Sequence, residues 1–498
     1  MLSTAKLQPH LSDHPYLIGI VGLSIGLLVL QIVQYLRNPL RHIPGPWLAR
    51  ISRLPLFVQS FTGTRVGWII EQHKHYGPVI RIAPNKVCVA SSEGVKAIYS
   101  NKAIKSSAYE GFKYHDVKMC IGLRDVKSAH TRRKGLLPAF SHQNLMEMEP
   151  VIRFHLERFL KWLEKFDHTR EYVDCFKWFR YLTFDVVADI AFGQQIGMLV
   201  QEDDNFIRHV EYRNKRNGLA GPFPFIIPLL KILNPETARN WINADDEIAK
   251  YAIRARDGWS RAEKDHRPRV DILARLEEAA VKNPKEALSP EEIIAEMMEI
   301  LNAGSDTTAN TAMFASYELA TRPDVQQKLY DELLEAFPDD SEPLTFAKLS
   351  QLPFLDGACR EALRIHAPIP SYLERLAPEG GLSIEGTFIP EGTIVGMQAY
   401  TNHRDPSVYP DPFRFWPERW FNPSAEMKLN FLPFSAGPRS CIGLNLGNMQ
   451  LRIHLGHIFR MYEAVCAPQT TPEAMSHVEF FTIRPKNGKC DLYFRKRK

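Results

Sequence analysis

The 498-residue sequence has few cysteines, no linker-like stretch and no internal repeat. Its seven cysteines are odd in number and scattered, and no Cys-x-x-Cys pair occurs. This argues against a structural zinc site and favours a reducing compartment. Because no Gly/Ser-rich or low-complexity tract divides the chain, we expect one large domain over residues 48–498, although the length alone would allow two or three. The net charge is only +5 and no nucleic-acid motif is present, so nucleic acid is not an expected partner.

An apolar run near the N-terminus, from Tyr16 to Leu36, is long enough to cross a bilayer as a helix. A cleaved signal peptide is the alternative, but the run is long for one and lacks a clear cleavage site. Arg37, Arg41 and His42 follow it, so the positive-inside rule places the rest of the chain on the cytoplasmic side. We expect residues 1–36 to form a leader and anchor, and the Pro-containing residues 37–47 a stiff hinge.

Several stretches have a recognisable local pattern. Tyr76 to Ala90 holds two short β-branched runs around a Pro-Asn turn, which predicts a hairpin. Phe184 to Gly193 is typical of a core helix, and Phe388 to Val395 is strand-like. Gly218 to Leu230 is apolar but interrupted by prolines, so it cannot form one regular helix. That last stretch is either buried or dips into a bilayer surface.

The longest predicted helix begins after Ser289, with Pro290 at its first position and Glu292 completing a capping box. It is expected to run to Arg322. Its centre, Ala303 to Thr308, holds Gly, Ser, Asp and two Thr, which are poor helix formers. This pattern indicates a functional break in the helix. The alternative is that the hydroxyls bond back to the preceding turn.

A short stretch near the C-terminal end, Phe434-Ser-Ala-Gly437-Pro-Arg439-Ser-Cys441-Ile-Gly443, predicts a loop that binds a flat ligand. Gly437 and Gly443 would let the backbone turn and approach that ligand closely. Cys441 would supply a ligand sulfur, and Arg439 could pair with an acidic group on the ligand edge.

The apolar run from Leu444 to Val465 predicts a helix that starts just after Cys441. Its N-terminal amides would favour the thiolate over the thiol. A lone cysteine is more often a buried structural residue. However, the Phe-x-x-Gly-x-Arg-x-Cys-x-Gly string around Cys441 is specific, and it resembles the signature of the cytochrome P450 family.

The resemblance covers nearly the whole chain. It implies a mainly α fold with a small β region, preceded by one N-terminal transmembrane helix. It further implies haem b (iron protoporphyrin IX), with Cys441 as the axial ligand of the iron and Phe434 beside it.

Two further arginine-containing motifs support the resemblance. Glu361 and Arg364 share a helix face and can pair, and Arg419 could complete a buried Glu-Arg-Arg cluster. This looks like the triad that braces the family's haem loop, except that Trp420 stands where the family usually has Phe. By the same resemblance, Arg375 is a candidate to bind a haem propionate.

The basic stretch from Ala129 to Ser141 resembles the family's helix against the haem propionates. A solvated face is the alternative interpretation of such a cluster. The register set by the following Pro and Phe places Arg133 at the family's propionate-binding position. The family's frequent Trp one turn earlier is replaced by Ala129, which leaves the roles of His130 and Arg132 open.

The implied activity is that of a monooxygenase, because Asp306 and Thr307 match the family's proton-delivering acid and alcohol. We expect one oxygen atom from O2 to enter a small hydrophobic substrate by hydroxylation or epoxidation, with a terpenoid, polyketide or alkaloid metabolite as the substrate class. A haem-thiolate isomerase or dehydratase, or a haem sensor, remains the alternative. The expected pocket walls are Ala103 to Gly122, the helix face ending at Ala303, Ile369 to Leu373, and Phe480 to Thr482.

No flavin or nicotinamide motif follows the haem loop, so electrons from NADPH must come from a separate protein. The expected partner is NADPH-cytochrome P450 reductase, with cytochrome b5 as a second candidate, docking through Arg132, Lys134 and Lys428. Membrane lipid is the remaining partner. The expected location is the endoplasmic reticulum membrane, with a single membrane pass and the catalytic domain facing the cytoplasm.

Overall fold

The computed structural model describes residues 36–497 apart from 101–103, 168–170, 263–270 and 340–341, together with Gly26 and Val33. The predicted anchor, Tyr16 to Leu36, therefore lies almost wholly outside the described residues. Among the residues that are described, every helix is too short or too polar to cross a bilayer.

Helices make up most of the described chain. The α-helices are α2 (Trp47–Ile51), α3 (Leu54–Phe61), α4 (Arg65–Tyr76), α5 (Ser92–Ile98), α6 (Val126–Leu136), α7 (His142–Asp167), α8 (Cys175–Phe192), α9 (Met198–Gln201), α10 (Asn205–Ala220), α11 (Ile226–Leu233), α12 (Pro235–Ala262), α13 (Ile272–Lys282), α14 (Pro290–Ala320), α15 (Pro323–Ala336), α16 (Phe346–Leu349), α17 (Pro353–Ile365), α18 (Ala399–Asn402), α19 (Ala425–Asn430) and α20 (Leu444–Met461). Short 3-10 turns are η2 (Ser107–Gly111), η3 (Leu137–Phe140), η5 (Pro284–Glu286), η6 (Pro417–Trp420) and η7 (Gly437–Arg439).

The strands are short and form small sheets. They are β1 (Val79–Ala83), β2 (Lys86–Val89), β3 (Ile104–Lys105), β4 (Lys113–Tyr114), β5 (Val117–Lys118), β6 (Val173–Asp174), β7 (Arg375–Leu376), β8 (Leu382–Ile384), β9 (Thr387–Ile389), β10 (Ile394–Met397), β11 (Tyr462–Cys466), β12 (His477–Phe480), β13 (Thr482–Pro485) and β14 (Asp491–Lys496). This content confirms the mainly α fold with a small β region.

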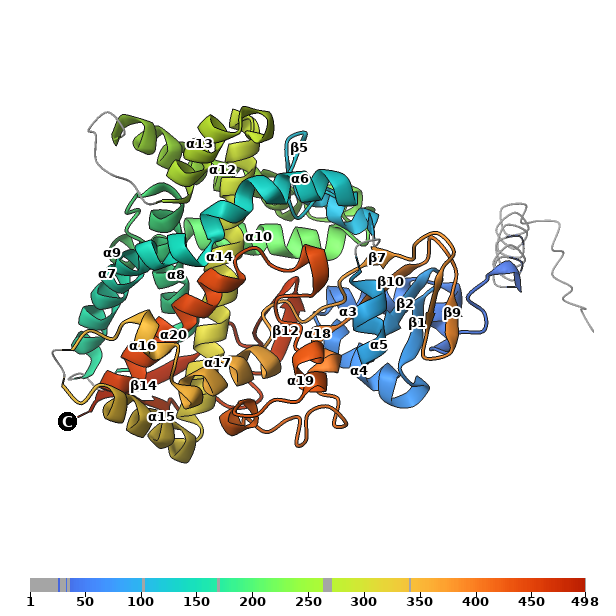
Figure 1. Ribbon diagram of the computed structural model, residues 1–498. Coiled ribbons are helices and arrows are strands. Elements are labelled where there is room, and N and C mark those ends of the chain that lie inside the picture. The colour runs from blue at the N-terminus through green and yellow to red at the C-terminus, as the bar shows by residue number, and fades with distance from the viewer. Residues whose placement is uncertain are drawn as a thin grey trace, which may run out of the picture.

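The largest sheet has the strand order β1-β2-β10-β7-β3 and lies at one end of the helical body (Figure 1). β1 and β2 form the predicted hairpin, with Val79 opposite Val89, whereas β10 joins β2 in parallel. β3 pairs with β7, which places Lys105 directly opposite Arg375. The sheet therefore brings together two cations that are far apart in the sequence.

Helix α14 runs through the middle of the molecule (Figure 1). The predicted capping box is present, because the Ser289 hydroxyl accepts from the backbone N–H of Glu292 while the Glu292 carboxylate accepts from that of Ser289. At about 1.5 Å per residue the helix is roughly 45 Å long. It ends at Ala320, slightly before the predicted Arg322.

The predicted interruption at the centre of α14 is absent, and the helix is continuous from Pro290 to Ala320. Instead, the hydroxyls of Ser305, Thr307 and Thr311 donate to carbonyl oxygens one turn earlier, at 2.7 to 2.9 Å. The poor helix formers are thus accommodated by local side-chain hydrogen bonds. Gly304 has a packing reason, since a Cβ there would lie 2.9 Å from a methyl group of Val187 on α8.

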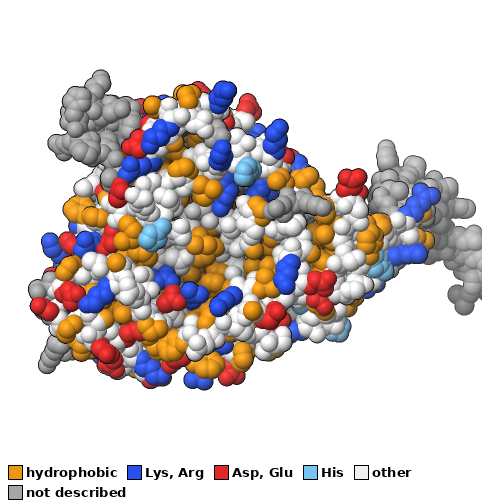
Figure 2. Space-filling view, in the orientation of Figure 1, with side chains coloured by type: hydrophobic (Ala, Val, Ile, Leu, Met, Phe, Trp, Pro, Cys, Tyr) orange, Lys and Arg blue, Asp and Glu red, His pale blue; other side chains and the backbone are white. Residues whose placement is uncertain are grey.

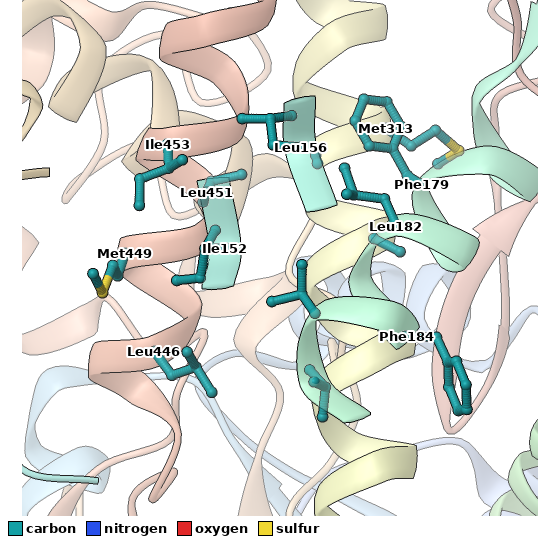
Figure 3. Close-up of a cluster of buried hydrophobic side chains, with 14 of the residues drawn as sticks. Ile152, Leu156, Phe179, Leu182, Phe184, Met313, Leu446, Met449, Leu451 and Ile453 are labelled. Atoms are coloured by element: carbon teal, nitrogen blue, oxygen red, sulfur yellow. The ribbon is translucent and has the colours of Figure 1, made fainter. Parts of the chain in front are cut away.

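The main hydrophobic core lies where α7, α8, α14 and α20 meet. Figure 3 shows side chains of these helices gathered together, among them Ile152, Phe179, Met313 and Leu451, all of them buried. The core helix predicted at Phe184 to Gly193 is the second half of α8, and Gly193 ends it in the left-handed conformation. The core thus fixes α14 against the helix that follows the cysteine loop.

Two predicted elements are subdivided in the structure. The strand-like run Phe388 to Val395 contributes to β9 and β10, with a turn between them. The predicted helix from Leu444 to Val465 ends at Met461, and the chain continues as β11. Tyr462 to Cys466 pairs with β14, so strand pairing replaces the last helical turn.

The surface mixes both signs of charge with scattered apolar side chains on the face shown in Figure 2.

As predicted, Gly218 to Leu230 is not one helix, since α10 ends at Ala220 and α11 begins at Ile226. The segment 37–47 packs on the sheet, with Ile43 buried and the carbonyl oxygen of Pro44 accepting from the N–H of Arg81 at 2.7 Å.

Candidate active site

Cys441 stands at the end of a tight loop, and its thiol is exposed to a central cavity of about 290 Å³. Its backbone N–H donates to the carbonyl oxygen of Phe434 at 2.9 Å, which closes the loop. Burial raises the pKa of the Cys441 thiol, whereas the N–H of Gly443 and the charge of Arg133 lower it. Helix α20 begins at Leu444, which confirms the predicted helix start, and its N-terminal dipole would favour the thiolate.

The two glycines of the loop have different roles. Gly437 has a φ of +69°, and a Cβ there would lie 2.0 Å from the carbonyl oxygen of Tyr99, so glycine is required by the turn and by this neighbour. Gly443 has an ordinary φ of −85°, and its nearest neighbour would be the Cys441 sulfur at 3.9 Å. Gly443 lines the cavity, so its position is suited to a closely approaching ligand, but its φ does not require glycine.

The cavity draws its lining from all the segments predicted to form its walls. It lies between the Cys441 loop and the centre of α14 and includes Phe434 and Thr307. The predicted wall segments contribute Lys105, Tyr109, Cys120 and Ile121, then Ala303, then Ile369 and Leu373, and finally Phe481. These contributions place the predicted walls around one shared space.

Four cationic side chains line this cavity: Lys105, Arg133, Arg375 and Arg439. Among the described residues, none of the four forms an ion pair with a carboxylate. Lys105 and Arg375 donate to the carbonyl oxygens of Ile121 and Glu374 at 2.8 and 2.9 Å. Arg439 donates to three successive carbonyl oxygens, those of residues 123, 124 and 125, at 2.6 to 3.0 Å.

The electrostatics of the four cations call for a bound anion. Burial, with the charges of Arg375 and Arg439, holds the pKa of Lys105 well below its usual range. Like charges gathered in a buried space are costly without a counter-charge. Haem b carries two propionate carboxylates, so the cations and the Cys441 thiol together fit that group.

Sequence reasoning placed Arg133 and Arg375 correctly on the cavity, and it left Arg132 open. The structure resolves the choice. Arg132 is buried and donates to the Glu296 carboxylate at 2.6 Å and also pairs with Glu292. It does not line the cavity, and His130 is exposed elsewhere on α6. The prediction that Arg132 is a docking contact for a reductase is therefore wrong, because its charge is paired and buried.

The acid and alcohol predicted to deliver protons lie in different surroundings. Thr307 lines the cavity, and its hydroxyl donates to the carbonyl oxygen of Ala303 at 2.7 Å. Asp306 does not line the cavity, and its carboxylate is paired with Arg180 at 2.8 Å. Arg180 also pairs with the partly exposed Glu211 at 2.8 Å. A chain of charges thus runs from a partly exposed carboxylate to the residue next to Thr307.

The predicted Glu-Arg-Arg cluster is present and fully buried. Arg364 donates to both carboxylate oxygens of Glu361 at 2.7 and 2.8 Å, and Arg419 donates to one at 2.9 Å. Trp420, at the position where the family usually has Phe, also donates its indole N–H to Glu361 at 2.9 Å. The two arginines donate further to carbonyl oxygens between residues 403 and 414, which fixes that turn-rich segment.

His403 links this cluster to the cysteine loop. Burial lowers the pKa of His403 to about 3, so the imidazole is neutral. Its Nδ1 lies 2.8 Å from the carbonyl oxygen of Arg364, and its Nε2 accepts from the backbone N–H of Leu432 at 2.8 Å. Because a neutral ring has one donor and one acceptor, Nδ1 carries the proton. The cluster is thereby connected to the residues that lead into Phe434.

The charged side chains Lys105, Glu296 and Glu299 line the cavity within or beside predicted wall segments, but the sequence analysis did not single them out. Lys105 reaches the cavity through the pairing of β3 with β7, which no local pattern reveals. Glu296 and Glu299 stand seven and four residues before Ala303, so helical spacing would have placed them on its face. The sequence analysis, which expected a hydrophobic substrate, did not name these two carboxylates.

Comparison with known proteins agrees with this geometry. Residues 47–492 match the family model described as cytochrome P450. The chain is 34% identical to benzoate 4-monooxygenase of Aspergillus niger, with 89% of this chain and 91% of that protein covered. It is 28% identical to trichothecene C-4 hydroxylase of Trichoderma arundinaceum, with 87% and 88% covered. The chain therefore belongs to the cytochrome P450 family of haem-thiolate monooxygenases.

Proposed function

We propose that this enzyme inserts one oxygen atom from dioxygen into a small hydrophobic substrate, using electrons from NADPH passed on by a separate reductase. The observation that carries the proposal is the placement of Cys441 and Thr307 on one cavity that is also lined by four cationic side chains. The names of its relatives give different substrates and do not narrow the choice, so terpenoid, polyketide and alkaloid metabolites remain the proposed substrate class.

The residues divide the work between holding the cofactor and handling protons. Cys441 would hold the haem iron, and Lys105, Arg133, Arg375 and Arg439 its propionates. When bound, thiolate-ligated haem supplies the electron density that favours cleavage of the O–O bond.

Proton delivery falls to the centre of α14. Thr307 presents its hydroxyl on the cavity wall, where rotation from its bond to Ala303 would let it donate into the cavity. Asp306, the neighbouring residue, would take part in supplying protons to this position, and its carboxylate is held in place by Arg180, which also pairs with Glu211. A positioned proton donor of this kind typically contributes about a hundredfold or more in rate.

Membrane attachment is the second part of the proposal. The apolar run Tyr16 to Leu36 supports a single-pass anchor in the endoplasmic reticulum, with the catalytic domain in the cytoplasm. Exposed apolar side chains on α11 and directly before it support a further lipid contact, since Phe225, Ile232 and Leu233 are 53%, 79% and 71% exposed.

The test is product analysis with isotopically labelled dioxygen. The enzyme would be expressed with a reductase in a host without background metabolites, and candidate precursors would be supplied. We expect products one labelled oxygen heavier than the precursor, formed only when both NADPH and dioxygen are present. Turnover without NADPH or dioxygen would instead identify an isomerase or dehydratase and overturn the proposal.

A further inference from the structure

One wall of the cavity is acidic, which is not expected of a pocket for an apolar substrate. Glu296 and Glu299 both line it, and both stand on α14 before Ala303. A carboxylate in a largely apolar cavity is costly unless its oxygens find donors. The arrangement of these two side chains therefore bears on which substrates the cavity accepts.

Glu299 uses only one of its two carboxylate oxygens within the protein. Its Oε2 accepts from Arg213 of α10 at 2.8 Å, and the side chain is 13% exposed. Within the part of the chain that the structure describes, its Oε1 makes no hydrogen bond. An ionised carboxylate offers about four acceptor sites. Glu299 thus has acceptor capacity left for a molecule in the cavity.

The charge of Glu299 is already balanced by its neighbours. Arg213, which has no exposed side-chain surface, pairs with both Glu299 and Asp245. Asp245 in turn pairs with Arg216 at 2.7 Å. Two cations and two anions make the network neutral, so it needs a hydrogen-bond donor rather than another cation.

Glu296 differs from Glu299 because its bonds are directed into the protein. Its Oε1 accepts from Arg132 at 2.6 Å and from the backbone N–H of Cys120 at 2.8 Å, and its side chain is 3% exposed. Burial and the charge of Glu299 raise the pKa of Glu296 to about 7, against the charge of Arg132. Among the described residues the Oε2 of Glu296 also has no hydrogen bond, but its side chain is 3% exposed against 13% for Glu299, so Glu299 is the carboxylate with the more accessible acceptor.

We propose that Glu299 is a specificity-determining residue that accepts a hydrogen bond from a hydroxyl group of the substrate. The inference rests on the proposed function, because it places the substrate in the same cavity. Glu299 precedes Thr307 by eight residues, which is about 12 Å along a helix. The hydroxyl group would accordingly lie at the end of an apolar skeleton remote from the carbon that is oxidised. An anionic group at that end would face Glu299 and be disfavoured.

The test compares three ligands of one shape on the ferric holoenzyme: biphenyl-4-ylmethanol, biphenyl-4-carboxylate and 4-methylbiphenyl. Binding would be followed by the spectral shift of the haem and, independently, by equilibrium dialysis. Hydrogen bonds to charged groups are among the stronger ones, so we expect the alcohol to bind about tenfold or more tightly than the methyl compound. The carboxylate should bind most weakly.

Two variants then locate the cause. Glu299→Gln keeps the shape but replaces one acceptor by a donor, so the ratio of the carboxylate Kd to the alcohol Kd should fall at least about tenfold. Asp245→Asn is the matched control. It removes one negative charge that pairs with Arg213, as Glu299→Gln does, but Asp245 does not line the cavity, so the cavity wall is unaltered. In this control the ratio should change by no more than a few-fold.

An unchanged ratio in Glu299→Gln would overturn the proposal and leave Glu299 with only a structural role, as the salt-bridge partner that joins α14 to α10. An equal fall in both variants would also overturn it, since the effect would then come from the loss of any negative charge near Arg213 and not from a hydrogen bond between Glu299 and the ligand. These titrations need neither electrons nor dioxygen. Their outcome is consequently distinguishable from a failure of the monooxygenase proposal, which is tested by labelled dioxygen.

Discussion

Replacing Trp420 by Phe isolates one hydrogen bond of the buried cluster that supports the cysteine loop. The Glu361 carboxylate has no exposed surface and accepts from Arg364, Arg419, the backbone N–H of Trp416 and the indole of Trp420. The Phe variant keeps an aromatic ring but deprives one carboxylate oxygen of a donor. The perturbation is therefore local and chemically defined.

The expected cost follows from the type of bond that is lost. A hydrogen bond to a charged group contributes about 1.5–3 kcal/mol, so we expect a loss of about 2 kcal/mol. If that loss falls on the barrier to opening the haem loop, the rate of haem inactivation at a fixed temperature rises up to about thirtyfold. The assay is the decay of the reduced carbon-monoxide spectrum typical of thiolate-ligated haem during incubation at that temperature.

Trp416→Phe is the control for this prediction. The Trp416 ring lies over Arg419 at 4.9 Å, but only its backbone N–H, which the variant keeps, donates to Glu361. Because Phe keeps a ring face for the buried Arg419 guanidinium, the effect should stay below about 1 kcal/mol, a fraction of the roughly 2 kcal/mol of a desolvated cation–π contact. Equal decay rates in the two variants, or no acceleration in Trp420→Phe, would refute the assigned role of the indole hydrogen bond.

Three further outcomes are expected. Thr307→Ala and Asp306→Asn should keep the thiolate spectrum but yield less product per NADPH oxidised and more hydrogen peroxide; unchanged ratios in both would remove the proton-delivery role. Removing residues through Leu36 should shift much of the protein to the soluble fraction; a truncated form that stays wholly membrane-bound would show that this run is not the sole anchor. Reversing the exposed charges of Lys134 and Lys428 should lower reductase-dependent turnover most at low salt, because screening weakens charge-steered docking; turnover insensitive to both would count against that docking face.

Features with local signals could be predicted from the sequence. The capping box at Ser289 and the β1–β2 hairpin depend on residues a few positions apart, and both are present. The pairing of Glu361 with Arg364 depends on helical spacing in the same way. The position of Cys441 on the cavity followed from the specific string around it, together with the family resemblance.

Features that depend on distant pairings could not be predicted. Asp306 is paired with Arg180, from which it is separated by 126 residues, and nothing near either position indicates the other. Arg132 and Arg133 are adjacent, and the locations of Glu292 and Glu296, both distant in the sequence, decide which one turns away from the cavity. The prediction of a break in α14 was wrong because the Ser and Thr hydroxyls donate to carbonyl oxygens one turn earlier. These bonds accommodate residues whose intrinsic propensity disfavours a helix.

The central claim is that Cys441 ligates the haem iron as a thiolate in the cavity beneath α14. The measurement that tests it most directly is the reduced carbon-monoxide difference spectrum of the wild type and of Cys441→Ser, with total haem and folded protein quantified in parallel. We predict that the wild type shows the spectrum of thiolate-ligated haem and that the folded variant does not, because an alcohol is not a comparable anionic donor. A Cys441→Ser protein that retains this spectrum, or a haem-loaded wild type that lacks it, would contradict the assignment.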